Sequence, residues 1–186
     1  MNPATLCSLA ASAFVAANSK VDTCDKFDAF VIDKDSMGLN FRDAPNAKGR
    51  ILGQLGFECT VVVTKSSGMW LYVEADKDSE DCFDSMDENL KPIPYKGPTK
   101  GWVYAPLLGT NIENNGIPVF QSAQSRSHGY RLSEQYSVPL QSCAGKRVQL
   151  LLHEKPQKTG WVDGKYLCGN PHSNCSIWFK ELGPFN

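Results

Sequence analysis

The chain has 186 residues, a formal net charge of -1 and 41% hydrophobic residues, an ordinary globular composition with room for one medium core or two small ones. This balance of charge gives no reason to expect nucleic acid or a membrane surface as a partner. The charge is unevenly spread, because eight acidic side chains and a single lysine lie between Glu74 and Glu88.

Residues 1–19 carry no charge, are rich in alanine and end in small residues around Asn18, which is typical of a secretory signal peptide. A positively charged start is missing, so a short N-terminal helix packed on the rest of the protein is the alternative. The segment is barely long enough to cross a membrane and contains several polar residues. We therefore expect no membrane span, and we favour a periplasmic or secreted location.

Without residues 1–19 the chain has six cysteines, an even number that is typical of disulfide-bonded proteins in an oxidising compartment. They are Cys24, Cys59, Cys82, Cys143, Cys168 and Cys175. Cys168 and Cys175 enclose the turn-rich stretch GNPHSN, which predicts a disulfide between them. A zinc site formed by these two cysteines and His172 is the weaker alternative, because the spacing matches no common zinc motif. We expect no metal site.

Short segments rich in β-branched and aromatic residues follow one another from Val31 to Leu108, separated by clusters of turn-forming residues. The predicted strands are AFVI (29–32), GLNFR (38–42), RILGQL (50–55), ECTVVVT (58–64), GMWLYVEA (68–75) and KGWVYA (100–105). No helical period interrupts them. Five or six short strands in about seventy residues are too few for an open two-layer sheet, so we expect them to close as a small β-barrel.

The order GLNFRDAP, GRILGQLGFECTVV, GMWLYVEA and GWVYAPLL closely resembles the bacterial SH3-like (Src-homology-3-type) domain family. In that family an opening N-[VF]-R-x-x-P motif leads into a strand, a glycine-rich turn, a strand with tryptophan and a closing GWV followed by a short helical turn. The resemblance implies a first SH3-like barrel over residues 28–110, with an acidic insertion over residues 74–98.

The second half of the chain repeats this order in a degenerate form. GIPVFQSA, YRLSEQYSVPL and RVQLLLHE take the places of the first three motifs, and GWV recurs 59 residues after its first occurrence. This predicts a second, degenerate SH3-like barrel over residues 115–186 with a C-terminal strand. It lacks the Arg and Pro of the opening motif and has Val148 or Leu150 in place of Trp70. The expected fold class is therefore all-β, with two tandem small SH3-like β-barrels after the N-terminal signal or helix.

Catalysis is not expected from this sequence. The three histidines, at positions 128, 153 and 172, have no nucleophile pattern beside them, and neither a phosphate-binding loop nor a pair of carboxylates on a helix is present. A catalytic domain of the cell-wall peptidase type would need about a hundred more residues. We expect no catalytic residues and no cofactor.

The resemblance implies a shallow groove, lined by aromatic residues, that holds a peptide or a protein partner. Its candidates in the first copy are Trp70, Tyr72, Trp102 and Tyr104. Aromatic side chains suit this role because they supply contact area at a low cost in entropy. Core packing is the alternative for the two tryptophans and is favoured for Trp102, whereas Tyr72 and Tyr104 are expected on other faces and are the better contact candidates. Arg42, from the opening motif, either meets the ligand or fixes its loop through backbone carbonyls.

The acidic insertion is a feature that the resemblance does not explain. Its candidate binding residues are Asp76, Asp78, Glu80, Asp81 and Asp84. A solvated loop is the alternative. Cys82 indicates a tethered loop, however, and a tethered acidic loop would attract a basic partner and suit insertion into its active-site cleft. Calcium binding is the weakest possibility, since Asp81 stands where an EF-hand needs glycine.

Two functions remain open from the sequence. The first is a non-catalytic module that recognises a peptidoglycan peptide or an envelope protein. The second is a periplasmic inhibitor or immunity protein that neutralises a basic toxin or cell-wall hydrolase through the acidic loop. The first is favoured by the frequency of that role in the family, and the second by the absence of an attached catalytic domain.

Overall fold

A computed structural model of the chain describes residues 20–76, 82–83 and 95–172. Within these residues the regular structure is β-strand apart from two single-turn 3₁₀ helices, so the all-β prediction is confirmed. The strands are β1 (Asp22–Val31), β2 (Leu39–Arg42), β3 (Ile51–Leu55), β4 (Thr60–Ser67), β5 (Trp70–Ala75), β6 (Lys100–Tyr104), β7 (Leu108–Ile112), β8 (Ile117–Val119), β9 (Tyr130–Leu132), β10 (Gln135–Ala144), β11 (Arg147–Leu152) and β12 (Lys158–Asp163). The 3₁₀ helices are η1 (Ala105–Leu107) and η2 (Gly164–Tyr166). The expected N-terminal signal or helix and the expected C-terminal strand lie outside the described residues.

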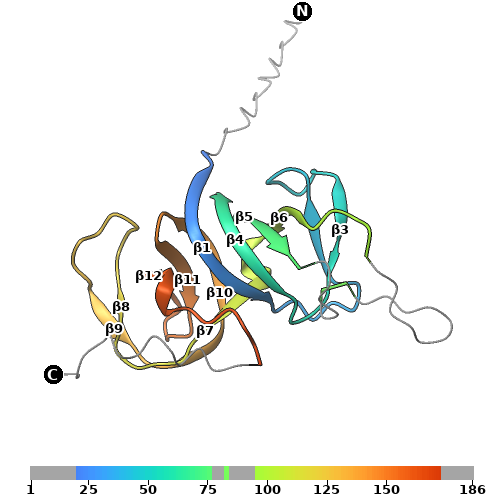
Figure 1. Ribbon diagram of the computed structural model, residues 1–186. Helices are drawn as coiled ribbons and strands as arrows, with labels where there is room; N and C mark the ends of the chain where they lie inside the picture. Colours follow the sequence, from blue (N-terminus) through green and yellow to red (C-terminus); the bar gives the residue numbers. More distant parts are fainter. Residues whose placement is uncertain (1–19, 77–81, 84–94, 173–186) are drawn as a thin grey trace, which may run out of the picture.

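Ten of these strands form one continuous sheet in the order β12-β11-β10-β7-β1-β4-β5-β6-β2-β3, and β8 pairs with β9 in a second, two-stranded sheet. All the strand pairs are antiparallel. Figure 1 shows β1 curving through the middle of the molecule, with β4, β5, β6 and β3 on one side and β8 to β12 on the other. β1 therefore joins the two halves of the chain.

The strand pairing of the first half recurs in the second. β1 pairs with β4 and β7, and β7 in turn pairs with β10 and, through Asn111, with Cys168. β7 thus ends the first set of strands and begins the second. Gly38 and Gly116 precede β2 and β8 with φ angles of 77° and 85°, a left-handed conformation that favours glycine. The alignment of GLNFR with GIPVF is therefore supported by the backbone as well as by the sequence.

The core follows from the period-two pattern of the strands, in which alternate side chains point to the same face. On β5 the residues Leu71 and Val73 are 0% and 1% exposed, and on β11 Val148 and Leu150 are 1% and 0% exposed. These side chains belong to one cluster of buried residues that runs through both halves. Since β1 and β7 contribute side chains to it, including the fully buried Val31, the two halves share a single apolar interior.

Two disulfides connect segments that are distant in sequence. Cys24 on β1 is bonded to Cys143 on β10, with a Cα–Cα distance of 5.7 Å, and so links the two halves. Cys59, just before β4, is bonded to Cys82 in the acidic insertion, with a Cα–Cα distance of 4.4 Å. Cys168 is also disulfide-bonded, while its expected partner at position 175 lies outside the described residues. The prediction of a disulfide-bonded protein is confirmed, and such proteins are typical of oxidising compartments.

Candidate functional site

The aromatic candidates come together on two neighbouring strands. In the β5–β6 pair Trp70 lies opposite Tyr104, and Tyr72 lies opposite Trp102. The ring centroids of these pairs are 5.7 Å and 5.3 Å apart, in tilted and edge-to-face arrangements that stabilise aromatic pairs. We call these four side chains the aromatic face.

The aromatic face corrects one expectation from the sequence. Tyr72 and Tyr104 were expected on faces other than those of the tryptophans, but residues two apart on a strand point to the same side, and cross-strand partners do so as well. The opposite side of β5 and β6 carries core residues such as Val103, which is 0% exposed. Tyr104 is 39% exposed, whereas Trp102 is 8% exposed. Trp102 is therefore buried as expected, although it is not part of the shared core.

Two cations extend the aromatic face across the sheet. Arg42 on β2 lies opposite Trp102, and Lys65 on β4 lies opposite Tyr72. The ammonium nitrogen of Lys65 is 5.3 Å from the centroid of the Tyr72 ring, a distance at which a cation is attracted to an aromatic ring. One row of side chains across β4, β5, β6 and β2 thus reads lysine, tyrosine, tryptophan, arginine.

Arg42 also has the local role that the sequence offered as an alternative. Its Nη1 atom donates a hydrogen bond of 2.8 Å to the backbone carbonyl of Gly49, so the guanidinium holds the turn between β2 and β3. This hydrogen bond is the contact with a backbone carbonyl that the alternative describes, and the side chain remains half-buried next to Trp102. Sequence reasoning missed Lys65, because its contact with Tyr72 depends on the register between β4 and β5.

An ion pair and a methionine complete the same surface. Lys100 and Glu74 form the cross-strand pair that follows Tyr72 and Trp102 on this face of β5 and β6. The Nζ atom of Lys100 is 2.6 Å from Oε1 of Glu74. The hydrogen bond to Glu74 and its negative charge raise the pKa of Lys100. At the other end the hydroxyl of Tyr104 is 3.9 Å from the sulfur of Met69, which is 40% exposed. The surface is thus apolar at the Met69 end, and Glu74 is neutralised at the other.

The corresponding surface of the second half has a different composition. In the pairing of β11 with β12, Arg147 lies opposite Asp163, which is the position that Trp70 and Tyr104 hold in the first half. The guanidinium carbon of Arg147 stacks 3.2 Å from the centroid of the Phe120 ring, and the two side chains are 7% and 8% exposed. The arginine therefore covers the ring.

This register corrects a second expectation. Val148 and Leu150 were expected in place of Trp70, but both are core residues, and Arg147 occupies that position. Phe120 opposite Trp161 repeats the pairing of Arg42 with Trp102. The cation and the aromatic side chain have thus exchanged strands in the second half. An arginine in place of a strand tryptophan gives no signal in a motif comparison, so the exchange was invisible in the sequence.

The acidic insertion is tethered, as its cysteine indicated. Cys82 is 1% exposed and bonded to Cys59, and Phe83 next to it stacks on Tyr95 with the ring centroids 3.8 Å apart. Asp76 is exposed at the end of β5. The other acidic candidates lie outside the described residues. They are Asp78, Glu80, Asp81 and Asp84.

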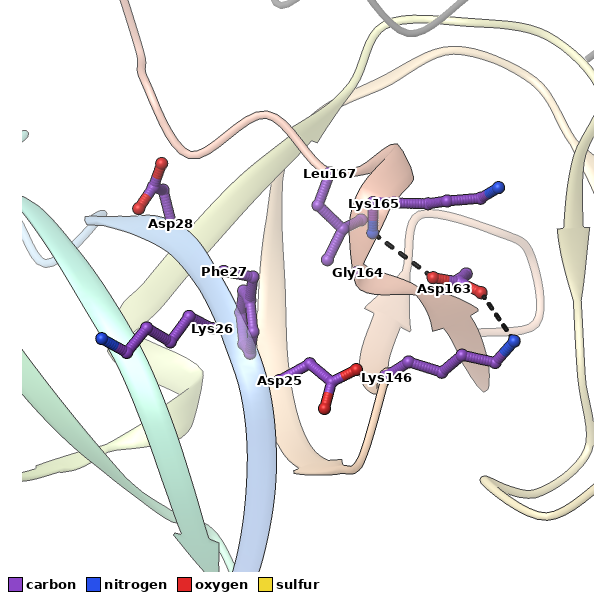
Figure 2. A pocket seen from close by; sticks show the side chains of 9 residues that line it. All are labelled: Asp25, Lys26, Phe27, Asp28, Lys146, Asp163, Gly164, Lys165 and Leu167. Carbon is purple, nitrogen blue, oxygen red and sulfur yellow. Dashed lines mark hydrogen bonds and ion pairs between the residues drawn. The ribbon is translucent and has the colours of Figure 1, made fainter. Parts of the chain in front are cut away.

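A charged cleft of about 320 Å³ lies between β1 and η2 (Figure 2). Three carboxylates and three lysines line it, so its charges balance. Asp163 is 3.5 Å from the ammonium of Lys146 and accepts a hydrogen bond from the backbone N–H of Lys165. In Figure 2 the side chains of Lys26 and Lys165 extend in opposite directions, away from the space between β1 and η2. Counted over its lining residues, the cleft carries no net charge.

The described residues contain no group of three or more side chains placed to bind a metal ion. Cys168, one of the three ligands in the alternative zinc reading, is committed to a disulfide and has no free thiolate. Across the same part of the chain we find no helix with the length and apolar character needed to cross a membrane. The chain matches no known protein family and shows no significant similarity to a characterised protein.

Proposed function

We propose that the protein is a non-catalytic binding module of the periplasm or the extracellular space, built from two tandem SH3-like barrels that share β7. Two features support the architecture. β1 pairs with β4 and β7 in the first half, and β7 pairs in the same manner with β10 and Cys168 in the second. In addition, a 3₁₀ helix follows each GWV strand. Disulfides support the location, because they persist in oxidising compartments.

The aromatic face carries the proposal. It places two aromatic pairs side by side on a rigid sheet, and it is bounded in one row by Lys65 and Arg42. Aromatic rings provide flat contact area, and the cations attract carboxylates. A cell-wall peptide, or a segment of an envelope protein with exposed carboxylates, fits this combination. We assign the second half a bracing role, since Gln149 and Asp163 stand where the first half has Tyr72 and Tyr104.

Cosedimentation of the protein with purified sacculi tests this function. We expect the replacement Tyr72→Ala or Tyr104→Ala to weaken binding about tenfold, as for a contact aromatic near the centre of an interface. Tyr130→Ala is the matched control, because Tyr130 is 37% exposed, against 39% for Tyr104, but lies on β9. Lys65→Gln should lower binding more at low salt than at high salt, whereas the exposed Lys48→Gln should not.

Two results would oppose the proposal. One is binding to sacculi that is unchanged in Tyr72→Ala and Tyr104→Ala. The other is the lack of both sacculus binding and any captured envelope protein with the unaltered chain. Capture of an envelope protein that depends on Tyr104 would retain the aromatic face as the site and assign its ligand to protein.

Inhibition of a basic toxin or hydrolase is the second candidate function, favoured by one observation. The disulfide between Cys59 and Cys82 holds part of the acidic insertion against the sheet, as an inhibitory loop requires. Neutralising the acids from Asp76 to Glu88 would then abolish a one-to-one complex with a basic enzyme, while Tyr104→Ala would leave it intact. The opposite pattern assigns binding to the aromatic face.

A further inference from the structure

Arg147, at the start of β11 in the second half, is a buried cation without a partner. Its side chain is 7% exposed, and its Nε and Nη1 atoms are fully buried with no hydrogen-bond acceptor among the described residues. Buried charges in proteins are normally paired, because removing a charged group from water is costly unless an opposite charge or hydrogen bonds replace the water. The guanidinium therefore lacks the acceptor that its burial calls for.

The two carboxylates of the β11–β12 hairpin are engaged by other groups. Asp163 lies opposite Arg147, but its Oδ2 atom is 3.5 Å from the ammonium of Lys146, and its Oδ1 atom accepts the backbone N–H of Lys165. Figure 2 shows both contacts as dashed lines. Glu154 is 3.3 Å from the ammonium of Lys158. Neither acid is thus committed to Arg147.

The guanidinium of Arg147 is held flat against an aromatic ring. Its carbon lies 3.2 Å from the centroid of Phe120, which is itself 8% exposed. Stacking occupies one face of the planar guanidinium and leaves its N–H groups to donate in the plane. The third nitrogen, Nη2, is not among the fully buried atoms and has no acceptor within the described part of the chain. An acceptor from outside the chain can therefore approach at Nη2.

The row of residues next to Arg147 on the same face is accessible to solvent. It reads Gln149 on β11, Trp161 on β12 and Phe120 after β8. Gln149 and Trp161 are half-buried. An amide can hydrogen-bond a polar ligand, and an indole ring supplies flat contact area. This row occupies the position that the aromatic face has in the first half.

The charge of the second half favours anions. Seven lysine or arginine residues and four aspartate or glutamate residues lie between Glu113 and His172. An excess of positive charge raises the local concentration of anions and steers them to the surface. This balance is the reverse of that in the acidic insertion of the first half.

We propose that Arg147 is the anion-binding residue of a second ligand site, on the β11–β12 face, which takes an oxyanion group, either a carboxylate or a phosphate. The oxyanion approaches at Nη2 and accepts hydrogen bonds from the edge of the guanidinium, whose planar arrangement of donors matches such groups. Phe120 holds the guanidinium in place for this contact. The site adds a ligand to the bracing role of the second half and does not depend on the aromatic face.

A titration of ¹⁵N-labelled full-length protein tests the site through two side-chain signals, the Nε–H of Arg147 and the indole N–H of Trp161. The probes are inorganic phosphate and acetate, each compared with sodium chloride at the same ionic strength. We expect saturable shifts of the Arg147 signal with at least one probe and none with chloride. Tighter binding of acetate assigns the site to carboxylates, and tighter binding of phosphate assigns it to phosphate groups.

A variant of Arg147 separates the guanidinium from its charge. Arg147→Lys retains the positive charge but loses the planar set of donors, and we expect the tighter probe to bind at least about fivefold more weakly, followed by the Trp161 signal. Arg126→Lys is the matched control, because Arg126 is exposed in the loop between β8 and β9. It should bind the probe like the unaltered protein. Unchanged amide shifts in β4 and β5 verify that each variant is folded.

A second set of variants leaves Arg147 in place. Lys146→Gln releases Asp163 to pair with Arg147, so it should weaken binding of the probe, and adding Asp163→Asn should restore it. Lys26→Gln makes the same charge change on β1, where the side chain extends away from Asp163, and should have a smaller effect (Figure 2).

Three results would overturn the proposal. The first is the absence of a saturable shift with both probes. The second is binding that is equally strong in Arg147→Lys. The third is binding that occurs in Asp163→Asn but not in the unaltered protein, which would show that Asp163 already serves as the counter-ion of Arg147.

Discussion

Replacing Cys24 and Cys143 together by alanine removes the covalent link between β1 and β10, and the size of the effect follows from the chain. The two residues are 119 positions apart, whereas Cys59 and Cys82 are 23 positions apart. In the chain-entropy account a disulfide stabilises by restricting the unfolded chain, and the effect grows with the logarithm of the loop length. The longer loop corresponds to about 5 kcal/mol and the shorter to about 3.5 kcal/mol.

The difference of about 1.5 kcal/mol between the two double variants is more reliable than either value, because the costs common to both cancel. All four cysteines are nearly buried, with exposures of 5% or less, so alanine leaves a similar gap at each site. Denaturation in guanidinium chloride, followed by tryptophan fluorescence, gives the free energy of unfolding of each variant. Should the Cys59 and Cys82 variant lose as much stability as the Cys24 and Cys143 variant, the argument from loop length would be refuted.

Three further predictions concern single residues. Gly38→Ala should destabilise the protein by more than the left-handed strain of about 1–2 kcal/mol, because the new Cβ would lie 2.7 Å from a backbone carbonyl oxygen. Gly68→Ala should cost only that strain, since nothing lies within 4 Å of its Cβ position, and equal losses of stability in urea denaturation would contradict this. Lys100→Gln should remove a stabilising ion pair with Glu74. Titration of Lys100 leaves this contribution intact below the ordinary lysine pKa of 10.5 and removes it as the pH rises through the raised pKa of the folded state. Melting temperatures that depend on pH in the same way in the variant and the unaltered protein would contradict this. Arg42→Lys should destabilise by about 1–2 kcal/mol through loss of the hydrogen bond that holds the β2–β3 turn, and an unchanged melting temperature would show that the bond contributes nothing.

Much of the local structure could be predicted because it depends on neighbours in the sequence. Alternating apolar residues with β-branched side chains gave strands close to their observed limits, as for RILGQL and β3 (Ile51–Leu55). Glycine before each opening motif has the positive φ that its position requires, at Gly38 and Gly116. The family resemblance implied a short helical turn after the closing GWV, and η1 and η2 follow the two GWV strands.

The candidate site was predicted only in part, because a binding surface depends on strand register. The four aromatic residues were identified from their motif. The period of a strand already places Trp70 with Tyr72 and Trp102 with Tyr104. That the two strands share one aromatic face follows only from the pairing of Trp70 with Tyr104 across a long insertion. Lys65 was missed for the same reason. The role of Arg147 was missed because an arginine within a strand motif gives no sign in the sequence that its guanidinium covers the Phe120 ring.

The sequence by itself determined which segments of this protein are strands, where the turns lie and that one pattern occurs twice, since these properties arise from the period of the side chains and from backbone freedom within a few residues. The tertiary structure decided which strands are neighbours. It joined Cys24 to Cys143, made β7 common to both halves and placed Lys65 beside Tyr72. Such contacts link residues far apart in the chain, and only the packing of a single shared core fixes the register that creates them.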